Sequence, residues 1–246
     1  MAAPPLTSLP SPEHYKHPDV NFNIPLPLTF ETRRVRLTPF IPTIHGEAFY
    51  SGFQADPDFA RYFPMSFPTY ATFLDFFETY IRSDPASVLF TIIDKTKTNG
   101  DENNNLKDCV AGIIGLLHSS PLNRSLEIGP VIVLPPFQRT FVSSNAIGLL
   151  LKYVLNVPSE GGLGFRRVVW TANPDNMASV KAAERMGFKQ EGVMRWTWCL
   201  PPDKAGKKAG NERGDACGRD SILLSLCWDD WENGGKEQVD KLIERV

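Results

Sequence analysis

Apolar and polar residues alternate along several short segments of this 246-residue chain, which is the pattern of strands that bury one face. Residues 31–37 predict the first strand, and residues 87–94 and 109–117 predict a later pair. The polar, turn-rich segment 98–105 between that pair predicts a hairpin loop. The same pattern predicts four more strands, at 125–134, 166–171, 188–199 and 221–228.

Helical spacing of apolar residues fills most of the intervals between these strands. Residues 42–53 predict a short helix, and residues 68–81 predict a helix with an aromatic face. Residues 139–157 predict a long helix, and residues 229–245 predict a polar helical tail. One more helix is expected to start with Asn173 as its cap and Pro174 in its first turn, and to end at Gly187.

The resulting order, β-α-α-β-β-β-α-β-α-β-β, predicts an α/β fold of the mixed (α+β) kind, a central mixed sheet flanked by helices. Seven of the 21 prolines lie in residues 1–27, so we expect an extended N-terminal region there and a folded domain over residues 28–232. Residues 233–246 are expected to form the tail, and the Gly-, Lys- and Pro-rich connector 201–218 to be mobile and outside the catalytic machinery.

Composition narrows the class of protein without choosing a function. Hydrophobic residues make up 42% of the chain and charged residues 22%, as in an ordinary globular protein. The net charge of −2 gives no reason to expect a nucleic-acid or membrane partner. The cysteines and histidines show no metal-ligand spacing, so we expect free thiols and no metal. Without a signal sequence or a long apolar segment, we expect a cytoplasmic monomer or homodimer.

The most informative segment, 126–140, places a strand, a tight loop and the start of a helix in succession. A helix N-terminus offers unpaired N–H groups that can hold a phosphate. A second segment, 166–188, places a buried strand before the Asn-rich start of the next helix. In open α/β sheets, ligands bind beyond strand ends and beside such helix starts.

At these residues the sequence resembles the GNAT superfamily of acyltransferases, in its RimJ/RimL-like branch. The shared patterns are E-I-G at Glu127–Gly129, N-x-x-N-x-x-S at Asn173–Ser179 and A-E-R-x-G-F at Ala183–Phe188. Gly218-Arg219-Asp220-Ser221, followed by two tryptophans, is also similar to the end of this branch. The resemblance covers residues 28–232 and implies an acetyl-CoA-dependent N-acetyltransferase.

The resemblance also implies where the cosubstrate binds. The fourth and fifth strands should splay apart, and the pantetheine arm should pair with the main chain around Val131 and Val133 as an added strand does. Asn173 or Asn176 should lie near this arm. The pyrophosphate should rest on the loop formed by Gln138, Arg139, Thr140, Phe141, Val142 and Ser143. In this loop Phe141 and Ser143 replace glycines that are usual in the family, so fewer N–H groups are expected to reach the phosphates.

Acyl transfer to an amine needs a base, an oxyanion donor and a proton for the leaving thiolate. Glu127 is the candidate base, and a strand-pairing carboxylate is its structural alternative. The Val133 N–H is the candidate oxyanion donor. A tyrosine that many GNAT enzymes use as general acid is replaced by Ala183, so Ser179 is the candidate donor to the sulfur. Water, or a serine that only bonds its own helix, stays open as an alternative.

Two function classes therefore remain. The first is an enzyme that acetylates a primary amine, of a small molecule or of a protein N-terminus, in a ternary complex. The second is a catalytically silent module that senses CoA or binds a partner. The acceptor pocket is expected between the aromatic segment 59–70 and the terminal hairpin around Arg195, Trp196 and Trp198, although these residues would also suit a core.

Overall fold

The computed structural model describes residues 17, 19–56, 58–97, 106–210 and 212–245. Its centre is a mixed sheet in the order β1-β2-β3-β4-β5-β6-β8-β7. The strands are β1 (Phe30–Glu31), β2 (Val35–Pro39), β3 (Val88–Asp94), β4 (Val110–Ser120), β5 (Ser125–Val133), β6 (Arg167–Ala172), β7 (Lys189–Cys199) and β8 (Gly218–Cys227). Every neighbouring pair is antiparallel except β5 and β6, which are parallel. The predicted mixed sheet flanked by helices is confirmed.

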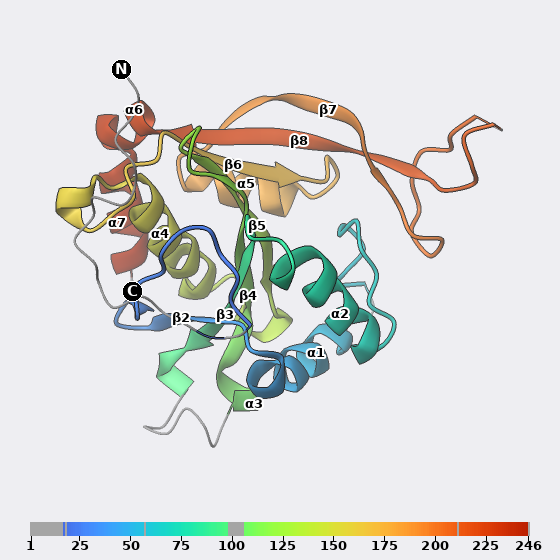
Figure 1. Ribbon diagram of the computed structural model, residues 1–246, viewed down its shortest axis with the longest axis horizontal. Coiled ribbons are helices and arrows are strands. Elements are labelled where there is room, and N and C mark those ends of the chain that lie inside the picture. Colours follow the sequence, from blue (N-terminus) through green and yellow to red (C-terminus); the bar gives the residue numbers. More distant parts are fainter. Residues whose placement is uncertain (1–16, 18, 57, 98–105, 211, 246) are drawn as a thin grey trace.

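The helices lie on both sides of this sheet (Figure 1). They are α1 (Glu47–Gln54), α2 (Tyr70–Phe76), α3 (Leu106–Cys109), α4 (Phe141–Leu155), α5 (Met177–Arg185), α6 (Trp228–Asp230) and α7 (Lys236–Glu244). Helices α4 and α7 pack together on one side of the sheet, and α1 and α2 lie on the other. None of the helices in the described residues combines the length and hydropathy that a bilayer crossing needs.

Two predicted boundaries are wrong for local reasons. The strand predicted at 31–37 is divided into β1 (Phe30–Glu31) and β2, which begins at Val35, because the Thr32 hydroxyl accepts the N–H groups of Arg34 and Val35 and forms a turn between them. The helix expected to start at Asn173 begins at Met177, because Asn176 caps it by accepting the Ser179 N–H at 3.1 Å. The predicted end at Gly187 is confirmed, since its φ of 96° is in the left-handed region that favours glycine.

The central helix α4 is buried along most of its length, which explains its nearly continuous apolar sequence. It packs against α7, where Gly148 permits the close approach: a Cβ at this position would lie 2.6 Å from Ile243 Cδ1. The tail helix α7 contributes the buried Val239 to the core. Before the sheet begins, Ile24 and Leu26 are also buried in that core. Residues that precede position 28 and residues that follow position 232 therefore also pack on the core.

Two expectations concern segments between strands. The predicted hairpin loop at 98–105 lies outside the described residues, as do residues 1–16 and 18 of the proline-rich region. The connector 201–218 joins β7 to β8 at the far end of their long ribbon, which extends beyond the rest of the sheet (Figure 1). It makes specific polar contacts: Lys204 Nζ donates to the Ala60 carbonyl at 2.7 Å, and Asp203 accepts from the Ser66 hydroxyl at 2.6 Å. These contacts join the connector to the aromatic segment 59–67.

Candidate functional site

A split in the sheet between β5 and β6 defines the site. The two strands pair at Ser125 with Arg167, Leu126 with Val168 and Glu127 with Val169, and no further pairing follows. Strand β5 continues to Val133, still paired with β4 on its other edge. Beyond Glu127 the facing edges of β5 and β6 are therefore not paired with each other, and Glu127 lies where the two strands diverge.

The free edge of β5 presents main-chain groups to this split. Leu134 N–H bonds the Ala111 carbonyl, so Gly112 and Val133 form a pair without mutual hydrogen bonds. In such a pair the N–H and C=O point away from the partner strand, here away from β4 and toward β6. The Val133 carbonyl accepts from Gln138 Nε2 at 3.0 Å. Val131, two residues earlier, has the same orientation, so the edge can bind an extended ligand as another strand would.

The Glu127 carboxylate is held at the start of the split by two side chains. Its Oε1 accepts from the Thr171 hydroxyl at 2.6 Å, and its Oε2 lies 3.1 Å from His118 Nδ1. The Glu127 side chain is 15% exposed, whereas that of His118 is 73% exposed. The hydrogen bond to Glu127 raises the pKa of His118. Neither partner was predicted from the sequence; Thr171 ends a predicted strand, and His118 lies one residue beyond another, on strands that flank the Glu127 strand.

The start of α5 lies across the split from β5. The Ser179 hydroxyl accepts from the Trp170 indole N–H at 3.1 Å, so its own proton remains available to a ligand. Asn176 caps the helix, while Asn173 accepts the Asp175 N–H and forms the turn before it. All three predicted residues, Asn173, Asn176 and Ser179, line the same cleft. Ala183 is fully buried instead.

The predicted phosphate loop leads into α4. Thr140 caps the helix, and its hydroxyl accepts the Val142 N–H at 3.3 Å. Arg139 has a φ of 59°, a conformation uncommon for a residue with a side chain. Of the six predicted loop residues, five line the cleft, and the exception is Val142, whose side chain is fully buried. Phe141 and Ser143, which replace the usual glycines, are in the first turn of α4.

Arg34 reaches this helix start from a distant segment, and other arginines line the same cleft. Arg34 lies with its guanidinium 4.3 Å from the centre of the Phe141 ring and donates to the Ile243 carbonyl at 3.1 Å. Arg185 from α5 and Arg245 after α7 also line the cleft. Sequence analysis identified only Arg139, because the others are brought there by tertiary packing. Positive charge beside a helix N-terminus suits a phosphate-bearing ligand.

These parts surround one continuous cleft of about 2150 Å³. Its other end has the aromatic walls expected for an acceptor: Phe59, Phe63 and Phe67 line it, and so does Trp198 from β7. Arg195 and Trp196 are not among the lining residues. Trp196 packs on Gly218, where a Cβ would lie 2.3 Å from its ring. The hairpin thus contributes one of the three expected residues.

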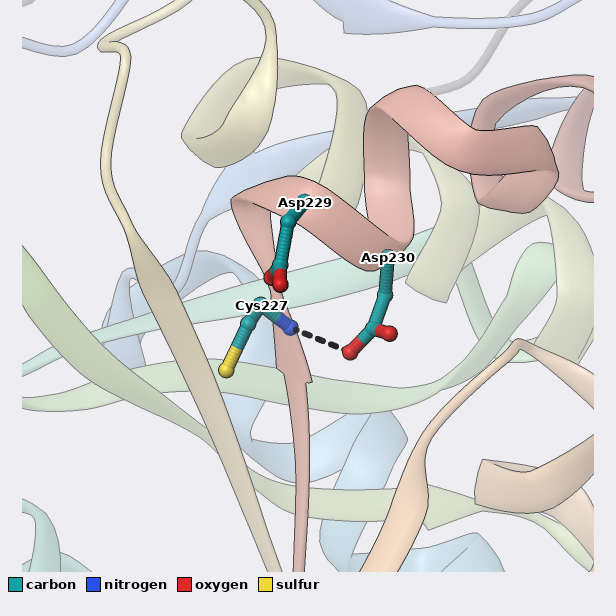
Figure 2. A group of neighbouring side chains, drawn as sticks. All are labelled: Cys227, Asp229 and Asp230. Atoms are coloured by element: carbon teal, nitrogen blue, oxygen red, sulfur yellow. Dashed lines mark hydrogen bonds between the residues drawn. The ribbon is translucent and has the colours of Figure 1, made fainter.

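Figure 2 shows a group of possible metal ligands, Cys227, Asp229 and Asp230, whose ligand atoms lie within 4.8 Å of one another. Asp230 accepts the Cys227 N–H at the start of α6 and pairs with Lys189. Cys227 pairs with Arg167, at the closed end of the β5–β6 split. The group is a helix cap and an ion pair, away from the cleft.

Comparison with known proteins agrees with this geometry. The model of the acetyltransferase (GNAT) domain family matches residues 34–189. A GCN5-related N-acetyltransferase from Brucella melitensis is 25% identical, with a TM-score of 0.69 over 88% of this chain and 86% of that chain. A search of curated proteins finds no match.

Two more distant structures share the fold alone. A GNAT-family acetyltransferase from Bacillus anthracis is 19% identical, with a TM-score of 0.57 over 82% of this chain and 99% of that one. A spermidine N-acetyltransferase from Vibrio cholerae, solved with CoA and spermine, is 14% identical, with a TM-score of 0.56 over 82% of this chain and 100% of that one. The family match, which spans most of the sheet and the whole split, decides the class. The chain therefore belongs to the GNAT acetyltransferase domain family and is an acyltransferase.

Proposed function

We propose that this protein transfers the acetyl group of acetyl-CoA to a primary amine, of a small molecule or of a protein N-terminus, by direct attack in a ternary complex. One observation carries the proposal: Glu127 is fixed at the point where β5 and β6 separate, inside a cleft that is lined from both sides of the split. A base at that point can serve an amine that meets a thioester held along the free edge of β5.

The residues around the split suit acetyl-CoA. The exposed main chain of Val131 and Val133 would pair with the two amides of the pantetheine arm. The N-terminus of α4, with Gln138 to Ser143, would hold the pyrophosphate, helped by Arg34 and Arg139. The arginine side chains offset the loss of the usual loop glycines. Asn173 and Asn176 lie on the far side of the split, where they could bond the same arm.

The chemistry assigns one task to each polar group. The amine nitrogen attacks the thioester carbon, and Glu127 accepts an amine proton through a water molecule. A main-chain N–H on the free edge of β5 stabilises the negative oxygen that forms. The predicted donor, Val133, is six residues from Glu127, or ~20 Å of extended strand, so a donor nearer to Glu127 suits this step. The C–S bond then breaks, and the thiolate of CoA receives a hydrogen bond from Ser179 and a proton from solvent. The proton of Ser179 is free for this bond because its oxygen accepts from Trp170.

Two measurements test the proposal. Acetyl-CoA at 100 times its Kd should stabilise the protein by about 2.7 kcal/mol, seen as a rise in Tm. A thiol-detecting reagent should then report CoA release with some members of a panel of amines, amino acids and N-terminal peptides. Stabilisation without release from any acceptor would favour the alternative, a silent CoA-sensing module, for which the glycine-poor loop is the supporting observation. No stabilisation at millimolar acetyl-CoA would contradict both.

The branch of the family, the location and the oligomeric state are further parts of the proposal. We propose membership of the RimJ/RimL-like branch on the motifs at Glu127–Gly129, Asn173–Ser179 and Ala183–Phe188. We also propose a cytoplasmic location, for which the four free cysteines are the supporting observation. Domain limits at residues 28 and 232 stay a proposal, and so does a monomeric or homodimeric state. Gel filtration with light scattering would decide the last.

A further inference from the structure

Arg219, on β8, has no counter-ion in the described part of the chain, although it lines the cleft. One terminal nitrogen of its guanidinium donates to the Tyr62 carbonyl at 2.7 Å, and the other donates to the Ser221 hydroxyl at 3.1 Å. Its Nε is buried and has no hydrogen-bond partner. Burial lowers the pKa of Arg219, and no carboxylate acts against that shift.

An arginine that is half-buried without an anion is costly, because its charge loses part of its hydration and gains no ion pair. Each terminal nitrogen carries two N–H groups, and each uses one in the bonds to Tyr62 and Ser221. One N–H on each nitrogen therefore remains for a ligand. The N–H groups of a planar guanidinium are strong donors to the oxygens of a carboxylate.

Arg219 lies on the same face of the sheet as the proposed base. Thr171, which bonds Glu127, is paired directly with Leu223 of β8. Residues two apart on a strand share a face, so Leu223, Ser221 and Arg219 all lie on the Glu127 side. Arg219 is four residues from Leu223, or ~13 Å along the strand. Asp220 points to the other face, where it pairs with Lys207.

The carboxylates that line the same cleft do not form a matching site for a polycation. Asp84 accepts from the Ala86 N–H and the Ser87 hydroxyl, so its oxygens serve the turn before β3. Asp56 accepts the Asp58 N–H, and the charges of both Asp56 and Asp58 act on Arg61, which lines the same cleft. Asp75 is a single exposed carboxylate on α2. None of these carboxylates forms an ion pair with Arg219 in the described residues, and Arg219 differs from the exposed arginines of the cleft because burial lowers its pKa.

Apolar side chains form much of the wall at this end of the cleft. Phe59, Phe63 and Met65 pack on the core with part of their surface in the cleft. Trp198 is 41% exposed and faces the same space from β7. Such a wall suits an apolar body between the reacting amine and the anion.

We propose that the acceptor carries a carboxylate as well as its amine, and that Arg219 binds this carboxylate while the aromatic wall holds an apolar side chain. The acceptor class is thus an apolar amino acid or a short peptide with a free C-terminus. This inference rests on the proposed N-acetyl transfer and names the substrate class of that site.

The test compares matched acceptors at fixed acetyl-CoA. Phenylalanine, methionine and the dipeptides Ala-Phe and Gly-Met are each paired with their C-terminal amides, and phenethylamine and spermidine complete the panel. The acids should exceed their amides in kcat/KM by on the order of 10- to 100-fold, the range for a charge-assisted pair. Equal rates for acid and amide, or a preference for spermidine, would overturn the inference and leave the transfer proposal intact. CoA release from no acceptor at all would overturn both.

Variants identify the residue. Arg219→Gln should reduce the acid-to-amide ratio of kcat/KM to about one, because the variant lacks the positive charge that binds the carboxylate. Arg219→Lys keeps this charge and should still prefer the acid. A merely structural role, holding Tyr62, would slow acid and amide equally and leave the ratio unchanged, which would contradict the assignment. Arg61→Gln, which removes the exposed arginine in the same cleft, is the matched control and should keep the ratio. The Kd for acetyl-CoA should stay unchanged in all three variants, and the Tm should stay unchanged in Arg61→Gln.

Discussion

The Glu127→Gln variant tests the proposed base most directly. The amide keeps the size of the side chain and can still accept from Thr171, so the split should keep its shape. The amide cannot accept a proton from the amine through water. General base catalysis contributes about 10²- to 10⁴-fold, so at pH 7 we expect kcat to fall by about 10²- to 10³-fold. The KM for acetyl-CoA should stay within about twofold, because the phosphate loop is not altered.

The rate of the Glu127→Gln variant should rise as the pH rises. At pH 7 a primary amine is neutral in about one molecule per thousand if its pKa is about 10 and in about one per ten if it is an α-amine with a pKa of about 8, and below its pKa the neutral fraction rises about tenfold for each pH unit. Without Glu127, the rate should follow this fraction and climb steadily with pH. In the unaltered protein the rate should level off earlier, because Glu127 removes the proton locally. Rate profiles from pH 6 to 9.5 would show the two curves converge.

An NMR titration of His118 provides an independent readout. The hydrogen bond to Glu127 raises the pKa of His118, so the Gln variant should return it toward the ordinary value of about 6.5. Thr171→Val is the matched control, because it loosens the carboxylate but keeps it, and should cost about tenfold or less. A shifted His118 pKa together with an unchanged kcat and pH profile would refute Glu127 as the base.

The remaining predictions address other parts of the site and the fold. Ser179→Ala should lower kcat by only about 3- to 10-fold in a CoA-release assay, because water can replace the hydroxyl; a loss as large as that of Glu127→Gln would contradict this role. Arg34→Ala should raise the Kd for acetyl-CoA about tenfold in calorimetry and weaken its salt dependence, whereas the exposed neighbour variant Arg33→Ala should not. Burial lowers the pKa of His45 to about 4, below its unfolded value, so stability is lost as pH falls from about 6.5 toward 4. Urea unfolding should show a loss of about 2 kcal/mol between pH 7 and 5 from this group, and His45→Asn, which can still accept the Ile41 N–H, should remove it.

The sequence by itself determined the elements whose signal is local. Strands β3 and β5 and helix α4 begin and end within about two residues of their predicted limits, because the periodicity of buried residues and the flanking turn residues act over short distances. The motifs that carry the family resemblance are also short segments that can be recognised from the local sequence. Glu127, Asn176 and Ser179 line the cleft because each is fixed by its own strand or helix start. The predicted Asn173 cap was wrong for a local reason too. Both asparagines accept a main-chain N–H, but Asn176 caps the helix while Asn173 forms the turn before it.

Only the tertiary structure decided which distant side chains act together. Arg34 and Arg245 are separated by most of the chain, and they meet because α7 packs on α4. His118 and Thr171 hold Glu127 from two different strands, through pairings that no single segment encodes. In the sequence Arg219 has no feature that sets it apart from other strand residues, and only the assembled sheet shows that none of the described residues forms an ion pair with it. Periodicity reports which face of an element is buried, but sheet order and helix packing determine what that face meets.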